Sequence, residues 1–486
     1  MKTKTLLLLS FSFIAFNTFS QQDSVSNNNV WSLKQCIDYA LANNLSVKRS
    51  NYDVETASLN YKQAKWAMMP NLNGSISYGY NWGRSLNPVT YEFTTQELNS
   101  INPGASSSVT LFNGFRIQNT IKQTQRSYHA SEQDLAKTKN DVMLNITSYY
   151  INVIFNKEQL ENARFQLASS QSQLDRVKRQ VSAGALPRSE ELNIDAQVAT
   201  NEVNVANQEN ALVLSLLQLK QALLLPASTP LDVQLIEIEV EDFVLDQSRD
   251  QIYDLARQIM PEIRSANLRV ESSYYAAKAA KGNLYPRLSL NGSINSNYSS
   301  ASDRPRFIPD GGDPIPTVEP IGFIEGTNTR VVRNSSIPSG TMEDGYGRRE
   351  QLKDNIYRSL GLSLTIPIFN GFQARYNWQS TVINREVAKI AYTEVEQALR
   401  QNVETAYNNA VAASKTYNAS LRQVEAREEA FRMMEQRMNA GAANSFEYQV
   451  SQNDLFRAKS DLTRAKYDLI FRKKLLDFYQ GKPLEY

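Results

Sequence analysis

Apolar and polar residues alternate with a period of two in several short segments of the chain. After Pro70, apolar residues from Leu72 to Trp82 alternate with Asn, Ser and Gly. The same alternation follows Pro286 and precedes Phe369. A period of two with one apolar face is typical of β-strands. The pattern predicts four strands, of which the second is the weakest, at about 71–83, 105–112, 287–299 and 356–368.

The polar positions of these segments are filled almost entirely by uncharged Ser, Asn, Thr and Gly. This composition suits a barrel wall with lipid outside and water inside, although a soluble sheet packed on a core would show the same alternation. Transmembrane barrels use at least about eight strands. Because open sheet edges are not tolerated in lipid, membrane-spanning strands would have to be shared among copies, and three copies would supply twelve.

Other stretches are long, free of proline and dominated by helix-forming residues. One helix is expected from Tyr39 to Ala67 and another from Arg116 to Ala183. At 1.5 Å per residue the second would reach roughly 100 Å, far beyond the roughly 30 Å hydrocarbon core of a bilayer. Apolar residues fall seven apart here and in the following stretch, at Leu160, Leu167, Leu174 and Val181, then at Val198, Val205, Leu212 and Leu219. Sustained heptads predict coiled-coil packing of paired helices, joined into hairpins by glycine-centred turns.

The chain contains an internal repeat. Phe112-Asn113-Gly114-Phe115 returns as Phe369-Asn370-Gly371-Phe372, and 369 − 112 = 257. Ala183-Gly184-Ala185 returns as Ala440-Gly441-Ala442 with the same offset, 441 − 184 = 257. Two landmarks that keep one spacing predict two structurally equivalent halves.

The repeat divides the chain into segments. We expect a signal peptide at 1–20, a first repeat at 21–225 with its hairpin tip near 184, and a linker at 226–250. The second repeat follows at 251–482 with its tip near 441. Its extra length lies in a Pro-, Gly- and charge-rich stretch at 301–355, which predicts a long exposed loop.

The first 20 residues have the layout of a secretory signal peptide, because Lys2 and Lys4 precede an apolar run that ends at Phe16. Without these two lysines the basic count is 52 − 2 = 50 against 50 acidic residues. A near-neutral mature chain does not suggest a nucleic-acid partner. Cys36 is the only cysteine, which excludes an intramolecular disulfide, and the preceding Lys34 and Gln35 argue against lipidation.

Candidate chemistry is sparse. His129 is the only histidine, so the sequence predicts no histidine-based metal cluster or catalytic triad. Asp310 and Asp313 flank glycines, but too few oxygen ligands recur there for a calcium loop. Neighbouring glutamates such as Glu428 and Glu429 lie on heptad-patterned helices and indicate surface charge. We therefore expect no enzyme, no cofactor and no metal.

Four features of the sequence belong together: the segment from Leu33 to Asn44, the strands that follow proline, the two Phe-Asn-Gly-Phe elements and the twin glycine tips. In this combination the chain resembles the TolC outer-membrane efflux family, over about residues 30 to 480. The resemblance implies a mixed α/β membrane protein in the bacterial outer membrane. Three copies would form a twelve-stranded β-barrel, four strands per chain, in contact with outer-membrane lipid. The barrel would continue into a twelve-helix α-barrel through the periplasm. The implied function is the exit duct of a tripartite efflux pump or type I secretion system.

The resemblance also implies roles for particular residues. The tips at Ala183, Gly184, Ala185, Ala440, Gly441 and Ala442 would dock a periplasmic adaptor and its inner-membrane pump. An acidic residue six positions after the second tip glycine can line the constricted end of the tunnel, and this position is Glu447. Position nine is Val450, which departs from the family's acidic pair, and the first-half counterpart of Glu447 is Glu190. A solvated charge at a helix start explains either glutamate equally well. The barrel–helix junctions are expected at Pro70, Phe112, Gly114, Pro286, Phe369 and Gly371.

Two other classes of function stay open on the sequence. One is a soluble periplasmic adaptor or scaffold built on a coiled-coil hairpin. The other is a cell-surface enzyme or binding protein that uses the loop at 301–350. The identity of a transported substrate is not encoded in any motif, because a water-filled duct has little need of a specific pocket.

Overall fold

The computed structural model describes residues 30–86, 92–95, 97–235, 247–300, 306–343 and 345–482, so the expected signal peptide lies outside the described residues. The chain forms two compact units. The helical unit comprises the described parts of Met1–Arg49, Lys137–Arg257 and Leu399–Tyr486. The strand unit comprises the described parts of Ser50–Ala136 and Gln258–Ala398.

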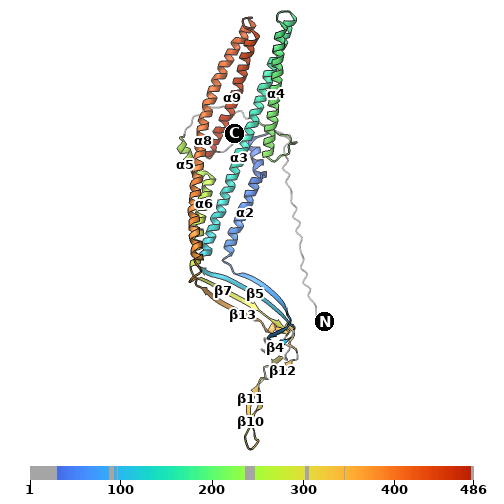
Figure 1. Ribbon diagram of the computed structural model, residues 1–486, viewed down its shortest axis with the longest axis vertical. Helices are drawn as coiled ribbons and strands as arrows, with labels where there is room; N and C mark the ends of the chain where they lie inside the picture. Colours follow the sequence, from blue (N-terminus) through green and yellow to red (C-terminus); the bar gives the residue numbers. More distant parts are fainter. Residues whose placement is uncertain are drawn as a thin grey trace. The chain divides into compact units, whose positions relative to one another are not determined.

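Each half contributes two shorter helices, strands and then two long helices (Figure 1). The single helix expected from Tyr39 to Ala67 is interrupted at Asn44, whose backbone leaves the helical conformation. The helices are α1 (Leu33–Asn43), α2 (Leu45–Trp66), α3 (Arg116–Ser182), α4 (Arg188–Ala222), α5 (Arg249–Ile259), α6 (Pro261–Lys281), η1 (Gly282–Leu284), α7 (Arg348–Asp354), α8 (Gln373–Asn439) and α9 (Ser445–Tyr479). The strands are β1 (Val30–Trp31), β2 (Asn71–Asn81), β3 (Arg84–Leu86), β4 (Phe93–Thr95), β5 (Leu98–Asn113), β6 (Asp232–Val233), β7 (Arg287–Asn295), β8 (Tyr298–Ser299), β9 (Arg306–Pro309), β10 (Ile315–Phe323), β11 (Arg330–Ile337), β12 (Gly340–Glu343) and β13 (Tyr357–Thr365).

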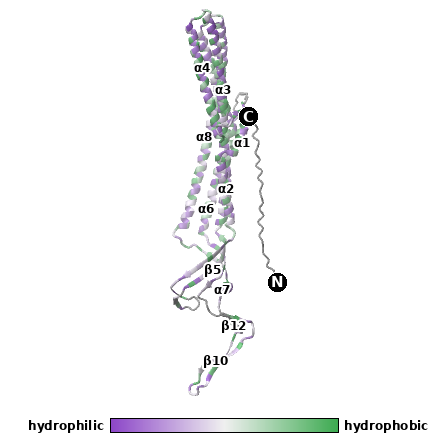
Figure 2. Ribbon diagram, turned by 90° about the vertical axis from the view of Figure 1, so that its right-hand side faces the viewer, coloured by the Kyte–Doolittle hydropathy of each residue, from purple (hydrophilic) through white to green (hydrophobic). Residues whose placement is uncertain are grey.

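The long helices recur at one offset. The first residues of α3 and α8 are 373 − 116 = 257 apart, and so are their last residues, 439 − 182 = 257. The helices α4 and α9 obey the same relation, because 445 − 188 = 257 and 479 − 222 = 257. Hydrophilic residues are spread along α3, α4 and α8, as expected for helices with more than one solvated or polar face (Figure 2).

None of the described helices contains a stretch that is both long enough and apolar enough to cross a membrane.

Apolar packing holds the first hairpin together near its tip. Leu174 and Val177 of α3 pack with Ile194 and Val198 of α4, and all four are buried. Two further heptad residues, Leu160 and Leu219, are 5% and 0% exposed. Full burial of one such side chain contributes about 1.5–3 kcal/mol. The seven-residue spacing therefore does place these side chains in the interior of the hairpin.

A tyrosine anchors the short sheet of the helical unit. β1 pairs with β6 in parallel, and the buried Tyr150 hydroxyl lies 3.0 Å from the carbonyl oxygen of Trp31 and 2.9 Å from that of Gln234. The same unit buries Cys36 completely on α1. Burial raises the pKa of the Cys36 thiol to about 12, which leaves it protonated and unreactive at neutral pH.

The strand unit is organised by one antiparallel sheet with the strand order β13-β7-β5-β2 and with β8 paired to β5. The expectation for the second strand, 105–112, was too short, because β5 spans Leu98–Asn113. The first part of β5 pairs with all of β2, from Leu98↔Asn81 to Ser108↔Asn71, and its second part pairs with β7. Backbone pairing on both sides makes this Ser- and Asn-rich segment a strand despite its low β-propensity.

The loop at 301–355 has more secondary structure than the sequence pattern predicts. Its described part contains the pair β9–β12, the hairpin β10–β11 and helix α7. β-Branched residues such as Val318, Val331 and Val332 favour extended structure within a stretch whose prolines and glycines suggest only turns.

Candidate functional site

The sheet of the strand unit has two chemically different faces. Directly opposed residues of neighbouring strands lie on the same face, so the register assigns every side chain. Leu362, Leu290 and Val109 stand in one row, and Leu364, Leu288 and Phe112 stand in another row of the same face. The opposite face carries rows of Ser, Asn, Thr and Gly, namely Asn73, Ser106, Ser293 and Ser359 in one row and Ser363, Ser289 and Thr110 in another.

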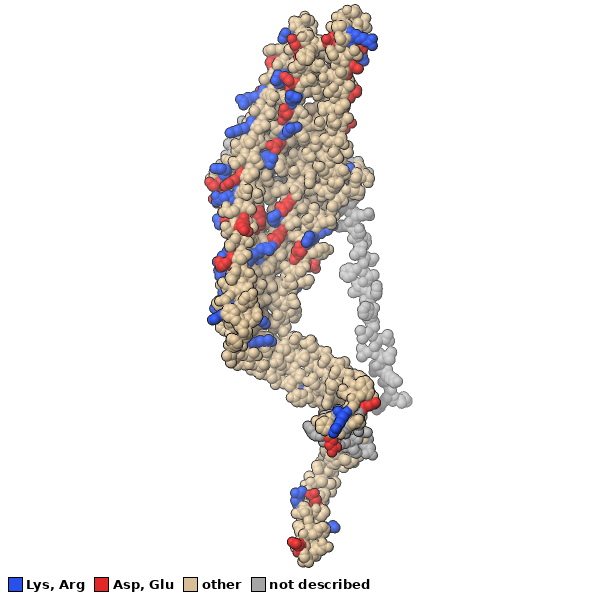
Figure 3. Space-filling model, viewed as in Figure 1, with Lys and Arg blue, Asp and Glu red and all other residues tan. Residues whose placement is uncertain are grey.

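The apolar face is largely exposed in a single chain. Leu72 and Leu360 are each 79% exposed and Ile76 is 75% exposed. A sheet face that exposes several large apolar side chains is unfavourable in water and marks a face that contacts lipid or another protein. The surface of the sheet is almost free of charge, whereas the helices carry many charged residues (Figure 3).

The polar face satisfies its side chains by hydrogen bonds across the strands. The hydroxyl of Ser108 donates to Oδ1 of Asn291 over 2.9 Å, and the hydroxyls of Ser293 and Ser359 lie 2.8 Å apart. Such a face suits water and neutral polar solutes. It does not select strongly for charge, because the groups that line it are dipoles and not ions.

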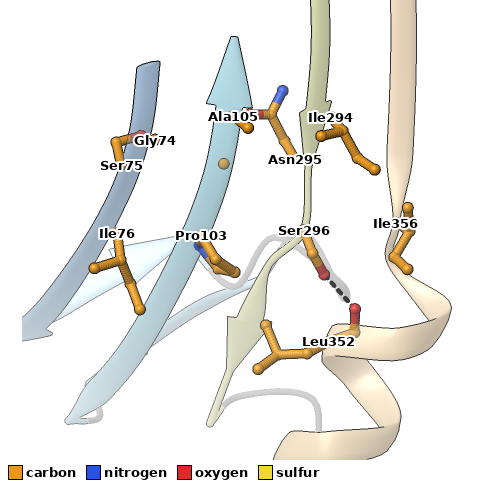
Figure 4. Close-up of a pocket in the computed structure, with 11 residues that line it drawn as sticks. Gly74, Ser75, Ile76, Pro103, Ala105, Ile294, Asn295, Ser296, Leu352 and Ile356 are labelled. Atoms are coloured by element: carbon orange, nitrogen blue, oxygen red, sulfur yellow. Dashed lines mark hydrogen bonds between the residues drawn. The ribbon is translucent and has the colours of Figure 1, made fainter. Parts of the chain in front are cut away.

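A shallow hollow of about 540 Å3 lies toward the α7 end of the sheet (Figure 4). Ile76, Ile294, Ile356 and Leu352 line it, together with small residues such as Ala105. The Ser296 hydroxyl donates to the carbonyl oxygen of Leu352 over 2.6 Å at its rim. Aliphatic carbon dominates this lining, so the hollow offers no acid–base pair. The described residues also contain no group of three His, Cys, Asp or Glu side chains placed to hold a metal ion.

The sheet ends in two edge strands. Among the described strands, β13 pairs only with β7, and β2 pairs only with β5. Each edge therefore presents a row of backbone N–H and C=O groups to whatever lies beside it.

The strand-to-helix junctions use residues with left-handed backbone conformations. Gly114 and Phe115 have φ of 63° and 60°, and their repeat counterparts Gly371 and Phe372 have φ of 60° and 68°. These residues form the sharp turns between β5 and α3 and between β13 and α8. Among the other predicted junction residues, Pro70 and Pro286 directly precede β2 and β7, Phe112 is the last residue but one of β5, and Phe369 lies in the connection between β13 and α8.

The two junction glycines differ in their surroundings, which yields a matched prediction. A Cβ on Gly114 would lie 2.6 Å from the carbonyl oxygen of Gly282 and 2.8 Å from Cβ of Tyr285, whereas a Cβ on Gly371 would have no described atom within 4 Å. Both alanine substitutions incur the left-handed strain of about 1–2 kcal/mol. We expect Gly114→Ala to destabilise the protein by roughly 1–3 kcal/mol more than Gly371→Ala, because it adds overpacking. Thermal unfolding of both variants measures the difference, and equal losses would contradict the close approach.

The hairpin tips are closed by Schellman turns. The N–H groups of Ala185 and Gly184 donate to the carbonyl oxygens of Gln180 and Val181 over 2.8 and 3.0 Å. The second tip has the same pair of bonds, from Ala442 to Arg437 and from Gly441 to Met438. Gly184 and Gly441 adopt φ of 75° and 71°, which glycine accommodates without strain. The predicted tip residues Ala183 and Ala440 end the helices on the other side of these glycines.

Glu190 and Glu447 both lie in the first turn of the helix that follows a tip. The backbone N–H of Glu447 is capped by Asn444 over 2.8 Å, and its carboxylate lies 4.0 Å from Arg437. Both carboxylates gain from the positive end of the helix dipole. The geometry thus explains their helix-start position and leaves a role in the ion path as a proposal.

An exposed aromatic residue beside the second tip has no counterpart in the sequence predictions. Phe446 is 72% exposed at the second position of α9, and the equivalent residue of the first half, 446 − 257 = 189, is Ser189. The only signal in the sequence is this departure from repeat symmetry. Exposed aromatic residues are typical anchors of protein–protein contacts.

Side-chain amides and hydroxyls form a polar seam between the two hairpins of the helical unit. The seam joins α3 to α9: Nε2 of Gln159 donates to the main-chain carbonyl oxygen of Ser460 over 2.9 Å, and the side chains of Gln166 and Asn453 and of Gln452 and Ser169 are bonded at 3.2 and 2.6 Å. Tyr467 and Glu158 form a further hydrogen bond along it. The same two helices also share an apolar contact, because the rings of Phe165 and Phe456 lie edge to face at 5.9 Å between centroids. The hydrogen-bonded partners can exchange for water at a smaller net change in free energy than an apolar contact when both partners reach solvent.

His129 lies on α3 with Nδ1 2.8 Å from the carboxylate of Glu132, and both side chains are 39% exposed. The pairing lowers the pKa of Glu132. An exposed contact between residues three apart on one helix is a surface contact and gives no sign of a catalytic site.

The fold matches solved outer-membrane channels over nearly the whole chain. CusC, whose structures concern transmembrane channel formation, aligns with a TM-score of 0.73 over 93% of this chain and 92% of its own, at 17% identity. VceC from Vibrio cholerae aligns with a TM-score of 0.71 over 93% and 97%, at 13% identity. These identities support the fold alone.

Curated relatives agree. The outer membrane protein TolC of Escherichia coli strain K12 is 21% identical over 97% of this chain and 85% of its own length. TolC of Vibrio cholerae is 25% identical over 38% of this chain, and the match spans 42% of that relative. BepC of Brucella suis is 21% identical over 89% of this chain and 81% of its own.

The sequence profile of the family described as "Outer membrane efflux protein" matches residues 36–223 and 252–479, which is most of the chain. These matched segments contain the four long strands of the sheet and both helical hairpins. The chain belongs to the outer membrane efflux protein family.

Proposed function

We propose that three copies of this chain form a continuous duct, through which substrates leave a periplasmic adaptor and an inner-membrane pump for the cell exterior. The single observation that carries the proposal is the two-faced sheet with two open edges. In an outer-membrane protein, the apolar face meets lipid and the Ser/Asn face meets the aqueous lumen.

The open edges favour assembly of several copies. Unpaired backbone groups in lipid cost several kcal/mol each. Pairing β13 of one copy with β2 of the next removes both edges, and three sheets of four long strands give 3 × 4 = 12 strands in a closed barrel. The proposed membrane partner is therefore outer-membrane lipid, and the proposed assembly is a homotrimer.

The hairpin tips are the proposed docking points for the adaptor. Their compact Schellman turns leave Ala183, Gly184 and Gly441 exposed, and Phe446 adds an apolar side chain beside the second tip. Each chain thus offers two similar but unequal docking points.

Gating is proposed to be a shift of one hairpin against the other. The polar seam between α3 and α9 favours this motion, because its hydrogen bonds can be replaced by bonds to water while the apolar core of each hairpin stays packed. Contact with an adaptor at the tips would bias the equilibrium between the two arrangements. Pump and adaptor supply the energy, and the duct itself conducts passively.

The alternative of a soluble periplasmic scaffold is disfavoured by the exposed leucines of the sheet. A water-soluble protein would leave Leu72, Leu360 and Leu362 in contact with solvent, at 79%, 79% and 64% exposure. The same face is favourable in lipid.

Planar-bilayer conductance of the purified mature protein tests the proposal. We expect stable channels, and we expect Glu447→Gln to reduce their preference for cations severalfold, because one negative charge per chain is removed near the tip. Glu190→Gln serves as the matched variant from the first repeat. If the cation preference of the channels is unchanged by Glu447→Gln, the proposed duct stands and Glu447 does not lie in the ion path. Trimers that are folded and inserted in the bilayer, yet do not conduct even when substitutions at the hairpin tips hold the tunnel open, would refute the proposed duct.

A further inference from the structure

Five side chains of α6 and α8 form a basic and aromatic cluster within the strand unit. Nζ of Lys278 lies 4.4 Å from the centre of the Tyr274 ring, and the guanidinium carbon of Arg385 lies 5.2 Å from the same centre. Nζ of Lys281 lies 5.6 Å from the centre of the Trp378 ring. Positions 274, 278 and 281 are four and three apart, so they share one face of α6. The cluster therefore gathers three positive charges around two aromatic rings.

No carboxylate neutralises this cluster. None of its three cations forms an ion pair with a carboxylate among the described residues, because the flanking acidic residues are bound elsewhere. Glu271 on α6 pairs with Arg126 over 2.9 Å, and Glu386 on α8 pairs with Lys389 over 3.0 Å. Contact with a ring orders a cation but leaves its charge uncompensated. The site is thus electrically incomplete within one chain.

Two further observations indicate that an anion is the missing partner. Nε of Arg385 is buried and has no hydrogen-bond partner among the described residues, which is unfavourable for a charged donor. Hydrogen bonding to Lys278, together with the charges of Lys278 and Arg385, lowers the pKa of the Tyr274 phenol. A negatively charged group that accepts hydrogen bonds would satisfy the donor and balance the charge.

The cluster lies at the end of the helices that adjoins the sheet. Lys281 is the last residue of α6, and five residues separate it from β7, whose Leu288 stands on the apolar face. Trp378 is the sixth residue of α8, which follows β13. Tyr285 and Phe372 lie in the two connections and are 47% and 52% exposed. Exposed aromatic residues beside an apolar sheet face are typical of the boundary between lipid and water.

The neighbouring helices are basic at the same end. Between the sheet and the first acidic residue along each helix, α2 carries Lys62 and Lys65, and α3 carries Arg116, Lys122 and Arg126. Elsewhere the long helices carry charges of both signs (Figure 3). A basic surround raises the local concentration of anions and repels cations.

We infer that Lys278, Lys281 and Arg385 bind the phosphate of a phospholipid headgroup in the periplasmic leaflet of the outer membrane. This inference rests on the proposed insertion of the sheet in that membrane. The guanidinium and ammonium groups donate to the phosphate oxygens, as is common in phosphate sites. The adjacent Tyr285 and Phe372 offer apolar contact to the lipid below the headgroup, which a free phosphate ion cannot use. The bound lipid fixes the depth of the helix ends relative to the membrane.

Binding of phosphatidylglycerol to the detergent-purified mature protein, measured by native mass spectrometry, tests the site. We expect the double variant Lys278→Gln and Arg385→Gln to bind this lipid roughly thirtyfold more weakly, because each basic residue near an anionic group contributes about a fivefold gain. Arg385→Lys should retain most of the affinity. Lys389→Gln is the matched control, since it removes a positive charge one turn further along α8 and should bind normally.

The outcomes separate the headgroup site from the barrel. If the double variant inserts and conducts as the native protein does, yet binds the lipid equally well, the headgroup site is wrong and the barrel stands. If inorganic phosphate binds the native protein as tightly as the lipid does, the site takes a soluble anion and the lipid is not its ligand. If the native protein does not insert into vesicles, the proposed barrel fails and this inference fails with it.

A depth measurement in vesicles is independent of affinity. A fluorophore attached at Lys281→Cys should be quenched severalfold more by a phospholipid with a nitroxide on its headgroup than one attached at Lys389→Cys. The second position lies eleven residues beyond Trp378 on α8, or about 16 Å along the helix. The native Cys36 is 0% exposed and does not react. Equally weak quenching at both positions would place the cluster away from the leaflet and overturn the inference.

Discussion

Arginine in place of Leu362 is expected to abolish assembly of the protein in the outer membrane, whereas arginine in place of the adjacent Ser363 is expected to leave assembly intact. The two residues are neighbours in β13, and the strand pleat puts them on opposite faces. Leu362 is 64% exposed in the apolar row with Leu290, and Ser363 pairs with Ser289 in the polar row.

The expected effects differ because the two faces meet different solvents. Arginine facing lipid near the bilayer midplane is unfavourable by about 2–4 kcal/mol per copy, and a trimer repeats the penalty three times. Arginine facing a water-filled lumen keeps its hydration. Ser363→Arg should instead shift the channel toward anions, because the Ser/Asn face has little charge of its own.

The amount of heat-resistant trimer in outer-membrane fractions measures assembly. The reversal potential in planar bilayers measures the ion preference of the channel. Leu362→Phe is the size control and should assemble normally. If Leu362→Arg assembles and Ser363→Arg does not, the sheet faces lipid with its polar side, and the proposed barrel is wrong.

Serine in place of Phe446 is expected to reduce export strongly without changing the channel itself. The substitution restores repeat symmetry at this one position, because Ser189 occupies the equivalent place in the first half. Loss of one aromatic anchor at the centre of an interface typically costs about 2 kcal/mol or more, which corresponds to roughly a thirtyfold loss of affinity.

Export of a reporter substrate in cells and affinity for the purified adaptor are the measurements. Phe446→Leu should retain most of both, because it preserves apolar contact. Conductance of Phe446→Ser should match the native channel, since the ring is 72% exposed and contributes little to packing within the chain. Normal adaptor affinity in Phe446→Ser would place the docking surface elsewhere on the tips.

Several outcomes could be anticipated because they depend on neighbours in the chain. The glycine at each tip was predictable, since the left-handed turn that ends a helix favours glycine wherever it occurs. The burial of Leu160 and Leu219 was also predicted correctly from their heptad positions, because apolar residues spaced seven apart form a continuous packing stripe along a helix. The length of β5 was not predictable, because its Ser-rich stretch becomes a strand through pairing with β2 and β7.

The sequence by itself determined the periodic features of this protein: which side of each strand is apolar, where the long helices turn, and that two halves repeat 257 residues apart. These features follow from side-chain spacing along the backbone, which is a local property. Only the tertiary structure decided the contacts between distant segments. It paired β5 of the first half with β7 of the second, placed a polar seam between α3 and α9, and set Gly114 against Gly282 while leaving Gly371 open. Repeat symmetry in the sequence cannot distinguish such positions, because equal local sequences acquire unequal neighbours when the chain folds.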